Sequence, residues 1–185
     1  GFSELGLFAA ANSFRTLGLF MPVVLNNVGL ALLSHHRGLG DTVRFRRIFL
    51  ANLVVVLVVT SVGVAGVLVL GEEMLRLFGK SFVGGYPVLV MLVGSVIPES
   101  VVLVFYQAMQ SQDRMWFSLI FIVPRDLMLI GLTLALTPGW GSLGLAAAHT
   151  AAHTTALVIC LAIFRSKGLH LALPKPDGDN AFTNG

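Results

Sequence analysis

Six ionisable side chains stand inside long apolar stretches of this sequence, where they must either do chemistry or neutralise one another. They are Arg15, Glu99, Arg125, Asp126, His149 and His153. In hydrocarbon such a group costs at least about 2.5 kcal/mol to insert, so it usually faces another charge or a water-filled cavity. The chemistry that these residue types allow is ion pairing, proton or cation coupling, recognition of an anionic ligand, and metal binding.

Glu99 directly follows Pro98, and a proline inside a helix removes one helical hydrogen bond and leaves a backbone carbonyl free. A carboxylate at such a position can pair with an arginine, and we expect Arg125 or Arg15 as its partner. Two roles stay open. Glu99 is either a structural residue, held in a salt bridge or protonated, or a carboxylate that couples the movement of a proton or cation.

Arg125 and Asp126 bring two opposite charges next to Pro124. Adjacent side chains point about 100° apart on a helix, so we expect that the two do not satisfy each other alone and that one meets another helix or water. The planar fork of donors on Arg125 suits a phosphate or diphosphate, with structural pairing as the alternative. Arg15 either snorkels to the near surface or contacts a ligand, and Pro22 is expected to kink its helix.

His149 and His153 stand four residues apart and therefore on one face of a helix. The spacing permits shared metal ligation, but the zinc-protease pattern needs a glutamate after the first histidine, and Thr150 stands there. The alanines around the pair favour close helix packing, with cavity lining or protonation as the alternative. A membrane enzyme built from these histidines and Glu99 would need bound metal. We expect no metal site, no catalytic constellation and no cofactor.

The chain that carries these residues is too apolar for a soluble domain. Of its 185 residues 56% are apolar and 11% are charged, and the mean hydropathy is +0.87, whereas soluble chains carry about 25% charged residues. The net charge of +3 comes from scarce acids rather than many bases, which argues against nucleic acid as a partner. The single cysteine, Cys160, excludes an intrachain disulfide and is expected to be inert packing. Membrane lipid is the expected surrounding.

About 20 predominantly apolar residues cross a bilayer, and the sequence predicts five such helices. Their long, continuous apolar character favours helices over barrel strands, which alternate over about ten residues. We therefore predict an all-α polytopic membrane protein, with a transmembrane domain over residues 1–168 and a disordered cytoplasmic tail over 169–185. The predicted spans are 8–33, 48–70, 87–109, 115–136 and 143–164, and an amphipathic segment at 72–80 is expected in the outer interface.

Basic residues in the connections set the expected orientation, since cytoplasmic loops are enriched in Lys and Arg. The first loop, the third loop and the C-terminal segment carry most of the basic residues, and the opposite side of the membrane receives only Arg76 and Lys80. This distribution predicts cytoplasmic first and third loops, a cytoplasmic C-terminus and an external N-terminus. The bases on the cytoplasmic side are Arg37, Arg44, Arg46, Arg47, Arg114, Arg165, Lys167 and Lys175. The first span does not read as a signal peptide, because Glu4 stands in place of a basic start and Arg15 interrupts the apolar run. An external start without a signal predicts that upstream helices are missing.

Several small motifs, taken in order, resemble the polysaccharide and oligosaccharide flippases of the multidrug/oligosaccharidyl-lipid/polysaccharide exporter superfamily. The motifs are Leu5-Gly6 leading into Ala9-Ala10-Ala11, then Pro22, Leu33-Ser34, Gly40-Asp41 with Phe45-Arg46-Arg47, the segment 74–82, Gln107-Ala108-Met109, and Trp140-Gly141-Ser142-Leu143-Gly144-Leu145-Ala146. The resemblance covers about residues 5–168 and consists of diffuse patterns of small, apolar and basic residues.

This resemblance implies a two-lobed exporter in which the chain supplies the last five helices of the C-terminal lobe, with the N-terminal lobe of the same chain missing. It implies alternating-access transport of a polyprenyl-diphosphate-linked oligosaccharide across the cytoplasmic membrane, in polysaccharide biosynthesis, without covalent chemistry. Arg15 and Arg125 would then supply positive charge to the substrate cavity. Glu99 and Asp126 are acidic and differ from the purely cationic cavity of this family. Their role is left open between salt bridges to the arginines and ion coupling.

Two alternatives to the flippase stay open. The first is a cation-coupled multidrug exporter of the same superfamily, with Glu99 and Asp126 as the coupling carboxylates. The second belongs to another class and is a non-transporting membrane scaffold or gene fragment, in which the intramembrane charges would be replaceable.

Overall fold

The computed structural model describes residues 2–113 and 115–166, and these residues are helical apart from short turns. Four segments of this part are long and apolar enough to cross a membrane: Glu4–Gly38, Thr42–Arg76, Lys80–Gln110 and Met115–Arg165. The predicted all-helical architecture, compatible with a membrane protein, is therefore confirmed. The predicted tail at 169–185 lies outside the described residues.

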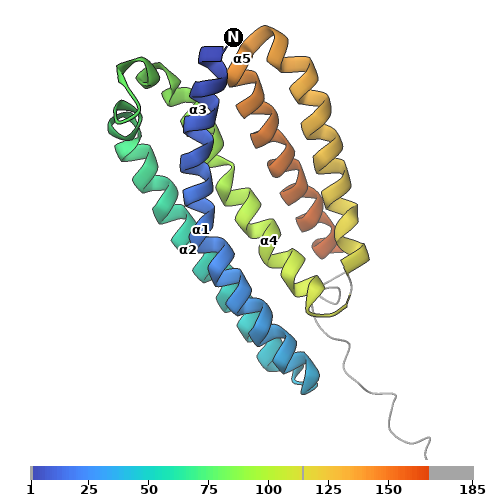
Figure 1. Cartoon of the computed structure of the whole chain (residues 1–185). Coiled ribbons are helices and arrows are strands. Elements are labelled where there is room, and N and C mark those ends of the chain that lie inside the picture. Colours follow the sequence, from blue (N-terminus) through green and yellow to red (C-terminus); the bar gives the residue numbers. More distant parts are fainter. Residues whose placement is uncertain (1, 114, 167–185) are drawn as a thin grey trace, which may run out of the picture.

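The first two helices, α1 (Phe2–Gly38) and α2 (Thr42–Arg76), form an antiparallel hairpin (Figure 1). Gly40 in the turn has a φ of 68°, a left-handed conformation that favours glycine, and the side chain of Asp41 then caps α2 by accepting a hydrogen bond from the backbone N of Arg44 at 2.9 Å. The α-helical conformation of α1 continues through Pro22. At 1.5 Å per residue both helices run for about 50 Å, so they exceed the roughly 30 Å of bilayer hydrocarbon.

The predicted span at 87–109 is divided into α3 (Tyr86–Gly94) and α4 (Val96–Gln110), which meet at Ser95. Pro98 is the third residue of α4, in the first turn, where a proline is tolerated because the N–H groups of a helix start lack partners within the helix. The predicted amphipathic segment at 72–80 is mostly the last turn of α2, and the short 3₁₀ helix η1 (Lys80–Gly85) follows it.

The last helical element, α5 (Met115–Ser166), contains the predicted spans 115–136 and 143–164 as two arms. Gly141 between them has φ 56° and ψ −132°, and the chain turns back on itself at this point (Figure 1). We call residues 115–140 the first arm and 142–166 the second arm. Two of the five predicted spans therefore fall within one continuous segment, and the described residues contain four membrane-length segments, the last of which reverses direction at Gly141.

Glu4 of α1 closes the turn between the two arms. Its Oε2 accepts a hydrogen bond from the backbone N of Ser142 at 2.7 Å, and the carboxylate lies directly against Gly141. The first N–H groups of a helix have no partner within the helix, so this side chain caps the second arm from another element. The start of α1 and the turn of α5 are thereby tied together at one end of the bundle.

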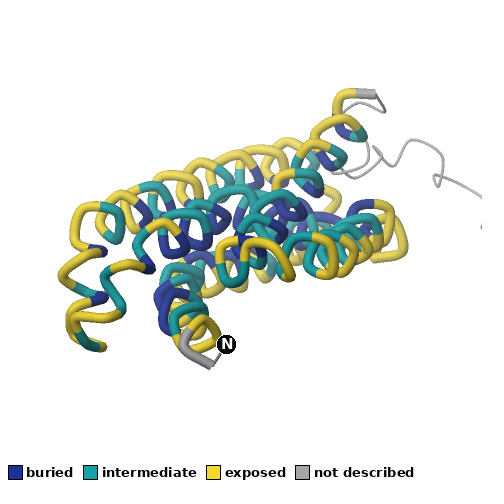
Figure 2. The backbone as a smooth tube through the Cα atoms, turned by 90° about the horizontal axis from the view of Figure 1, so that it is seen from above, coloured by how far each residue is buried: buried dark blue, intermediate teal, exposed yellow. Residues whose placement is uncertain are grey.

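Buried residues lie along the inner faces of the helices, while exposed residues lie on the outside (Figure 2). One apolar core cluster contains Phe45, Phe49 and Phe105, and a second contains Leu75 and Leu89. Large apolar side chains are also abundant on the outside, such as Leu17, Val62 and Leu134. In water such a surface would be a liability, whereas lipid-facing helices present it as a matter of course.

We predict that Gly141→Ala destabilises the protein and Gly139→Ala does not. The conformation of Gly141 is strained for other residues by about 1–3 kcal/mol, and an added Cβ would collide with the Glu4 carboxylate. Gly139 has open space around it in a helical stretch. Thermal unfolding of the purified protein in detergent, followed by circular dichroism, should show a lower Tm for Gly141→Ala only. Equal Tm values for the two variants would contradict this account of the turn.

Candidate functional site

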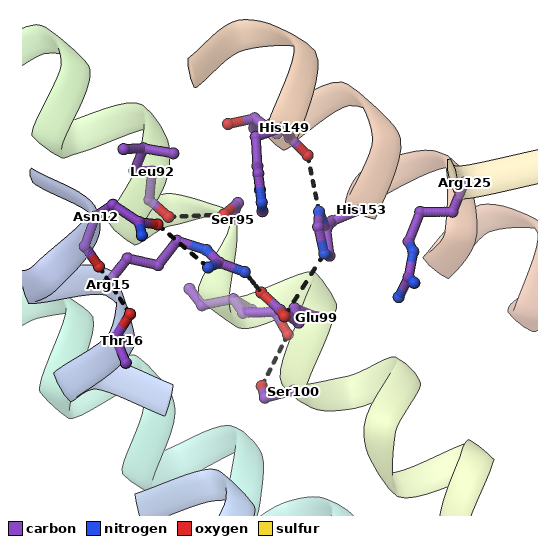
Figure 3. Close-up of polar contacts among 12 residues, drawn as sticks. Asn12, Arg15, Thr16, Leu92, Ser95, Glu99, Ser100, Arg125, His149 and His153 are labelled. Carbon is purple, nitrogen blue, oxygen red and sulfur yellow. Dashed lines mark hydrogen bonds and ion pairs between the residues drawn. The ribbon is translucent and has the colours of Figure 1, made fainter. Parts of the chain in front are cut away.

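Three of the predicted site residues, from three different helices, meet inside the bundle (Figure 3). The Nη2 of Arg15 on α1 forms an ion pair with Oε2 of Glu99 on α4. The other carboxylate oxygen, Oε1, lies 3.6 Å from Nε2 of His153 on the second arm of α5. We call Arg15, Glu99 and His153 the ion-pair cluster. Of the two partners expected for Glu99, the structure places Arg15 against it.

The cluster is held by local structure on each helix. α4 begins after Ser95, so Glu99 falls in its first turn. On α1, Nη1 of Arg15 is 3.5 Å from Oδ1 of Asn12, which lies one turn earlier. The side chains of Arg15, Glu99 and His153 are 11%, 23% and 7% exposed, so the charges are largely removed from the surroundings. Arg15 is thus held in an ion pair rather than reaching for the membrane surface.

His149 and His153 lie together, as their spacing predicts. Their rings stack with centroids 4.4 Å apart and planes 11° from parallel. Nδ1 of His153 also contacts the backbone O of His149 at 2.9 Å. Because a carbonyl oxygen only accepts hydrogen bonds, Nδ1 must be the donor in this contact. His149 therefore fixes both the plane and the tautomer of His153.

This tautomer has a consequence for the contact with Glu99. A neutral imidazole that carries its proton on Nδ1 presents only a lone pair at Nε2, and an ionised carboxylate repels a lone pair. The contact between Nε2 and Oε1 is therefore attractive when His153 carries both protons, or when Glu99 is protonated. The contact therefore needs one proton shared between the imidazole and the carboxylate.

Arg125 and Asp126 pair with each other, and both side chains also remain accessible to their surroundings. Nε and Nη2 of Arg125 lie 2.9 Å and 2.8 Å from Oδ1 of Asp126. The length of the arginine side chain lets it reach the neighbouring carboxylate in spite of the angle between the two positions. Asp126 is 50% exposed and Arg125 27% exposed, so this pair lies nearer the surface than the ion-pair cluster.

A cavity of about 300 Å³ connects the two charged groups, because Glu99 and Arg125 both line it. Its walls come from α1, α4 and the first arm of α5. His149 and His153, which were predicted as cavity-lining residues, are not part of this lining; His153 belongs to the ion-pair cluster and His149 stacks on it. Arg125 is thus the predicted arginine that borders open space, while Arg15 is engaged by Glu99.

The described residues hold no group of three or more His, Cys, Asp or Glu side chains arranged to bind a metal ion. Cys160 is fully buried in the apolar core cluster around Phe105. The arrangement can thus neutralise charge, bind and release a proton, and offer a cation to a ligand in the cavity.

A set of amides between the helices was not among the predicted site residues. Nδ2 of Asn52 on α2 donates to Oδ1 of the fully buried Asn26 on α1 at 3.1 Å. Gly29 makes room for this contact, since a Cβ there would lie 2.6 Å from Nδ2 of Asn52. Asn27, the next residue on α1, has its Oδ1 3.5 Å from Nε2 of Gln107 on α4. Amides inside otherwise apolar runs are the sequence signal that indicates such interhelical contacts.

Comparison with known proteins gives no relative, since no family model, no curated protein and no solved structure matches this chain. The geometry and chemistry of the residues alone therefore bear on the function.

We predict that removing Glu99 alone destabilises the protein more than removing Glu99 together with Arg15. Breaking one side of a buried ion pair costs about 3–5 kcal/mol, whereas replacing both partners by apolar side chains is often close to neutral. We expect Glu99→Met to lower the free energy of unfolding by that amount and the double variant Arg15→Met/Glu99→Met to recover most of it. Unfolding in mixed micelles with increasing dodecyl sulfate measures these differences.

The exposed pair of Glu73 and Arg76 provides the matched control, with 67% and 51% of the side chains exposed. Glu73→Met should change the free energy of unfolding by less than about 1 kcal/mol. Losses that simply add up in the double variant would show that Arg15 and Glu99 do not depend on each other.

Proposed function

We propose that this chain is part of a flippase in the cytoplasmic (inner) membrane, which moves a polyprenyl-diphosphate-linked oligosaccharide across the bilayer by alternating access. The reaction makes and breaks no covalent bond. It would serve polysaccharide biosynthesis or export. The substrate contacts arginine through its diphosphate and small polar side chains through its sugar hydroxyls.

The observation that carries this proposal is the placement of Arg125. Its guanidinium borders a cavity in the middle of an apolar helical bundle, ten residues into the first arm of α5. An ionisable side chain at membrane depth is a functional-site hypothesis by default. A guanidinium fork is well suited to phosphate oxygens, which it can bind through two parallel hydrogen bonds. A lipid diphosphate crossing the membrane needs such a partner.

The proposal extends to the membrane topology. The reversal at Gly141 lets the two arms of α5 serve as two separate spans, which gives five spans in all. With basic connections on the cytoplasmic side, the N-terminus is external and the C-terminus cytoplasmic. We propose that these five spans form most of one six-helix lobe, and that a second lobe of the same transporter encloses the substrate cavity together with it.

Ion coupling is the second candidate, and the contact between Glu99 and His153 favours it. The pair can hold one proton between Nε2 and Oε1, beside the positive charge of Arg15. A cation-coupled multidrug exporter would use such a site to link proton movement to transport. In a scaffold without transport the same contact would only join helices.

We predict that Arg125→Ala slows translocation by about ten- to a hundredfold without loss of expression. Hydrogen bonds to charged groups contribute about 1.5–3 kcal/mol, and each 1.4 kcal/mol is a factor of ten. The measurement uses proteoliposomes with the intact transporter and a fluorescent lipid-linked oligosaccharide, whose arrival in the outer leaflet is read with a membrane-impermeant quencher. Arg76→Ala, at the exposed end of α2, is the control and should transport normally. Unimpaired transport by Arg125→Ala would refute the assignment.

The second candidate predicts a different result for Glu99→Gln. If Glu99 couples transport to a proton, an imposed proton gradient should accelerate translocation by the unmodified protein and have no effect on the Glu99→Gln variant, because the amide cannot take up the proton. Glu73→Gln serves as the control and should keep the gradient response. Transport that ignores the gradient in all three proteins would exclude proton coupling through this site.

A further inference from the structure

The cavity between α1, α4 and the first arm of α5 is charged at one end and apolar along most of the rest, where Tyr106 contributes the one hydroxyl group. Its volume of about 300 Å³ is at the lower end of the range for small-molecule sites. The polar end holds Glu99 and Arg125. The apolar side chains in its walls are Leu19, Val23, Val102, Leu103, Phe121 and Ile122.

The lining residues run along all three helices toward the same end of the bundle. On α4 they extend from Glu99 to Tyr106, which corresponds to about 10 Å of helix. On the first arm of α5 they extend from Arg125 back to Phe121. α4 and this arm are joined at their far ends, so the apolar part of the cavity lies toward that turn (Figure 1). Val23 on α1, which is 41% exposed, is the one exposed residue of this lining, and we take its position as the mouth of the cavity.

The polar end has a surplus of hydrogen-bond donors. The Glu99 carboxylate is occupied by Arg15 and His153. Arg125 uses only Nε and Nη2 on Asp126, so among the described residues its Nη1 keeps two N–H donors without a partner. Arg125 is 27% exposed and borders the cavity, so a ligand can reach these donors. An anionic group is the ligand chemistry that such donors bind best.

The size and depth of the cavity distinguish among anionic lipids. A channel of this volume and length accommodates part of one hydrocarbon chain, whereas ordinary bilayer lipids carry two. Arg125 lies about 15 Å along the helix from Met115, which is half the hydrocarbon thickness of a membrane. Bilayer lipids keep their headgroups at the surface, and a lipid in the course of translocation does not.

From these features we infer that the cavity is a subsite for the hydrocarbon chain of a single-chain lipid phosphate, whose phosphate binds Nη1 of Arg125. The inference rests on the proposed function, because transport is what brings a lipid phosphate to this depth. It adds that the chain of the substrate enters the protein next to its phosphate, between α1 and α5, instead of remaining in the bilayer.

The test is equilibrium binding of radiolabelled geranylgeranyl phosphate to the full chain in phosphatidylcholine nanodiscs. Arg125→Gln removes the positive charge and the guanidinium fork at the polar end and should weaken binding about tenfold. Val23→Trp fills the mouth of the cavity from an exposed position that tolerates a large side chain, and should weaken binding to a similar extent. The matched control is Val24→Trp, because Val24 is 42% exposed, adjacent in sequence and outside the cavity lining. It should bind as the unmodified protein does.

Two competitors separate the sources of affinity. Unlabelled geranylgeraniol, which lacks the phosphate, should compete weakly, and phosphatidylglycerol, which has two chains, should compete weakly as well. Binding that Arg125→Gln leaves unchanged, equal effects of Val23→Trp and Val24→Trp, or full displacement by phosphatidylglycerol would each overturn the inference. Binding is measured without transport, so the two proposals fail separately. If Val23→Trp still translocates the substrate, the subsite inference is refuted and the flippase proposal stands. If the protein binds the lipid phosphate in this cavity but never translocates it, the flippase proposal is refuted and the subsite stands.

Discussion

The ion pair between Arg15 and Glu99 is the interaction on which the rest of the bundle depends. In surroundings of low polarity neither charge is tolerated alone, so α1 and α4 must stay in the register that brings them together. His153 adds the second arm of α5 to the same point. The break at Ser95 and the capped turn at Gly141 are the local features that allow these three elements to meet.

The same ion pair determines which arginine is available to a ligand. Arg15 and Arg125 both have the chemistry to bind a phosphate, but Arg15 is neutralised by Glu99. Arg125 is paired with a half-exposed neighbour and borders the cavity. Both arginines therefore have a carboxylate partner, but only Arg125 lines the cavity and keeps its Nη1 outside the contacts with Asp126.

The positions of the apolar helices and the residues of the site could be predicted from the sequence, because long apolar runs and isolated charges are local signals. The partner of Glu99 could not, since Arg15 and Arg125 are equally plausible until the helices are packed. The tight reversal at Gly141 between two predicted spans depends on one glycine's φ and on Glu4, which is 138 residues from Ser142 in the sequence. The pairing of Arg125 with Asp126 depends on the reach of a long side chain, which helical angles do not capture.

The most direct test of this account is a distance measurement inside the membrane. Solid-state NMR of the chain in lipid bilayers can detect the dipolar coupling between the guanidinium nitrogens of Arg15 and the carboxyl carbon of Glu99. The account predicts a strong coupling that is unchanged in Arg125→Gln, because Arg15 alone holds Glu99. No coupling to Arg15, or a coupling of Glu99 to Arg125 instead, would contradict the central role of this ion pair and the assignment of Arg125 to the ligand.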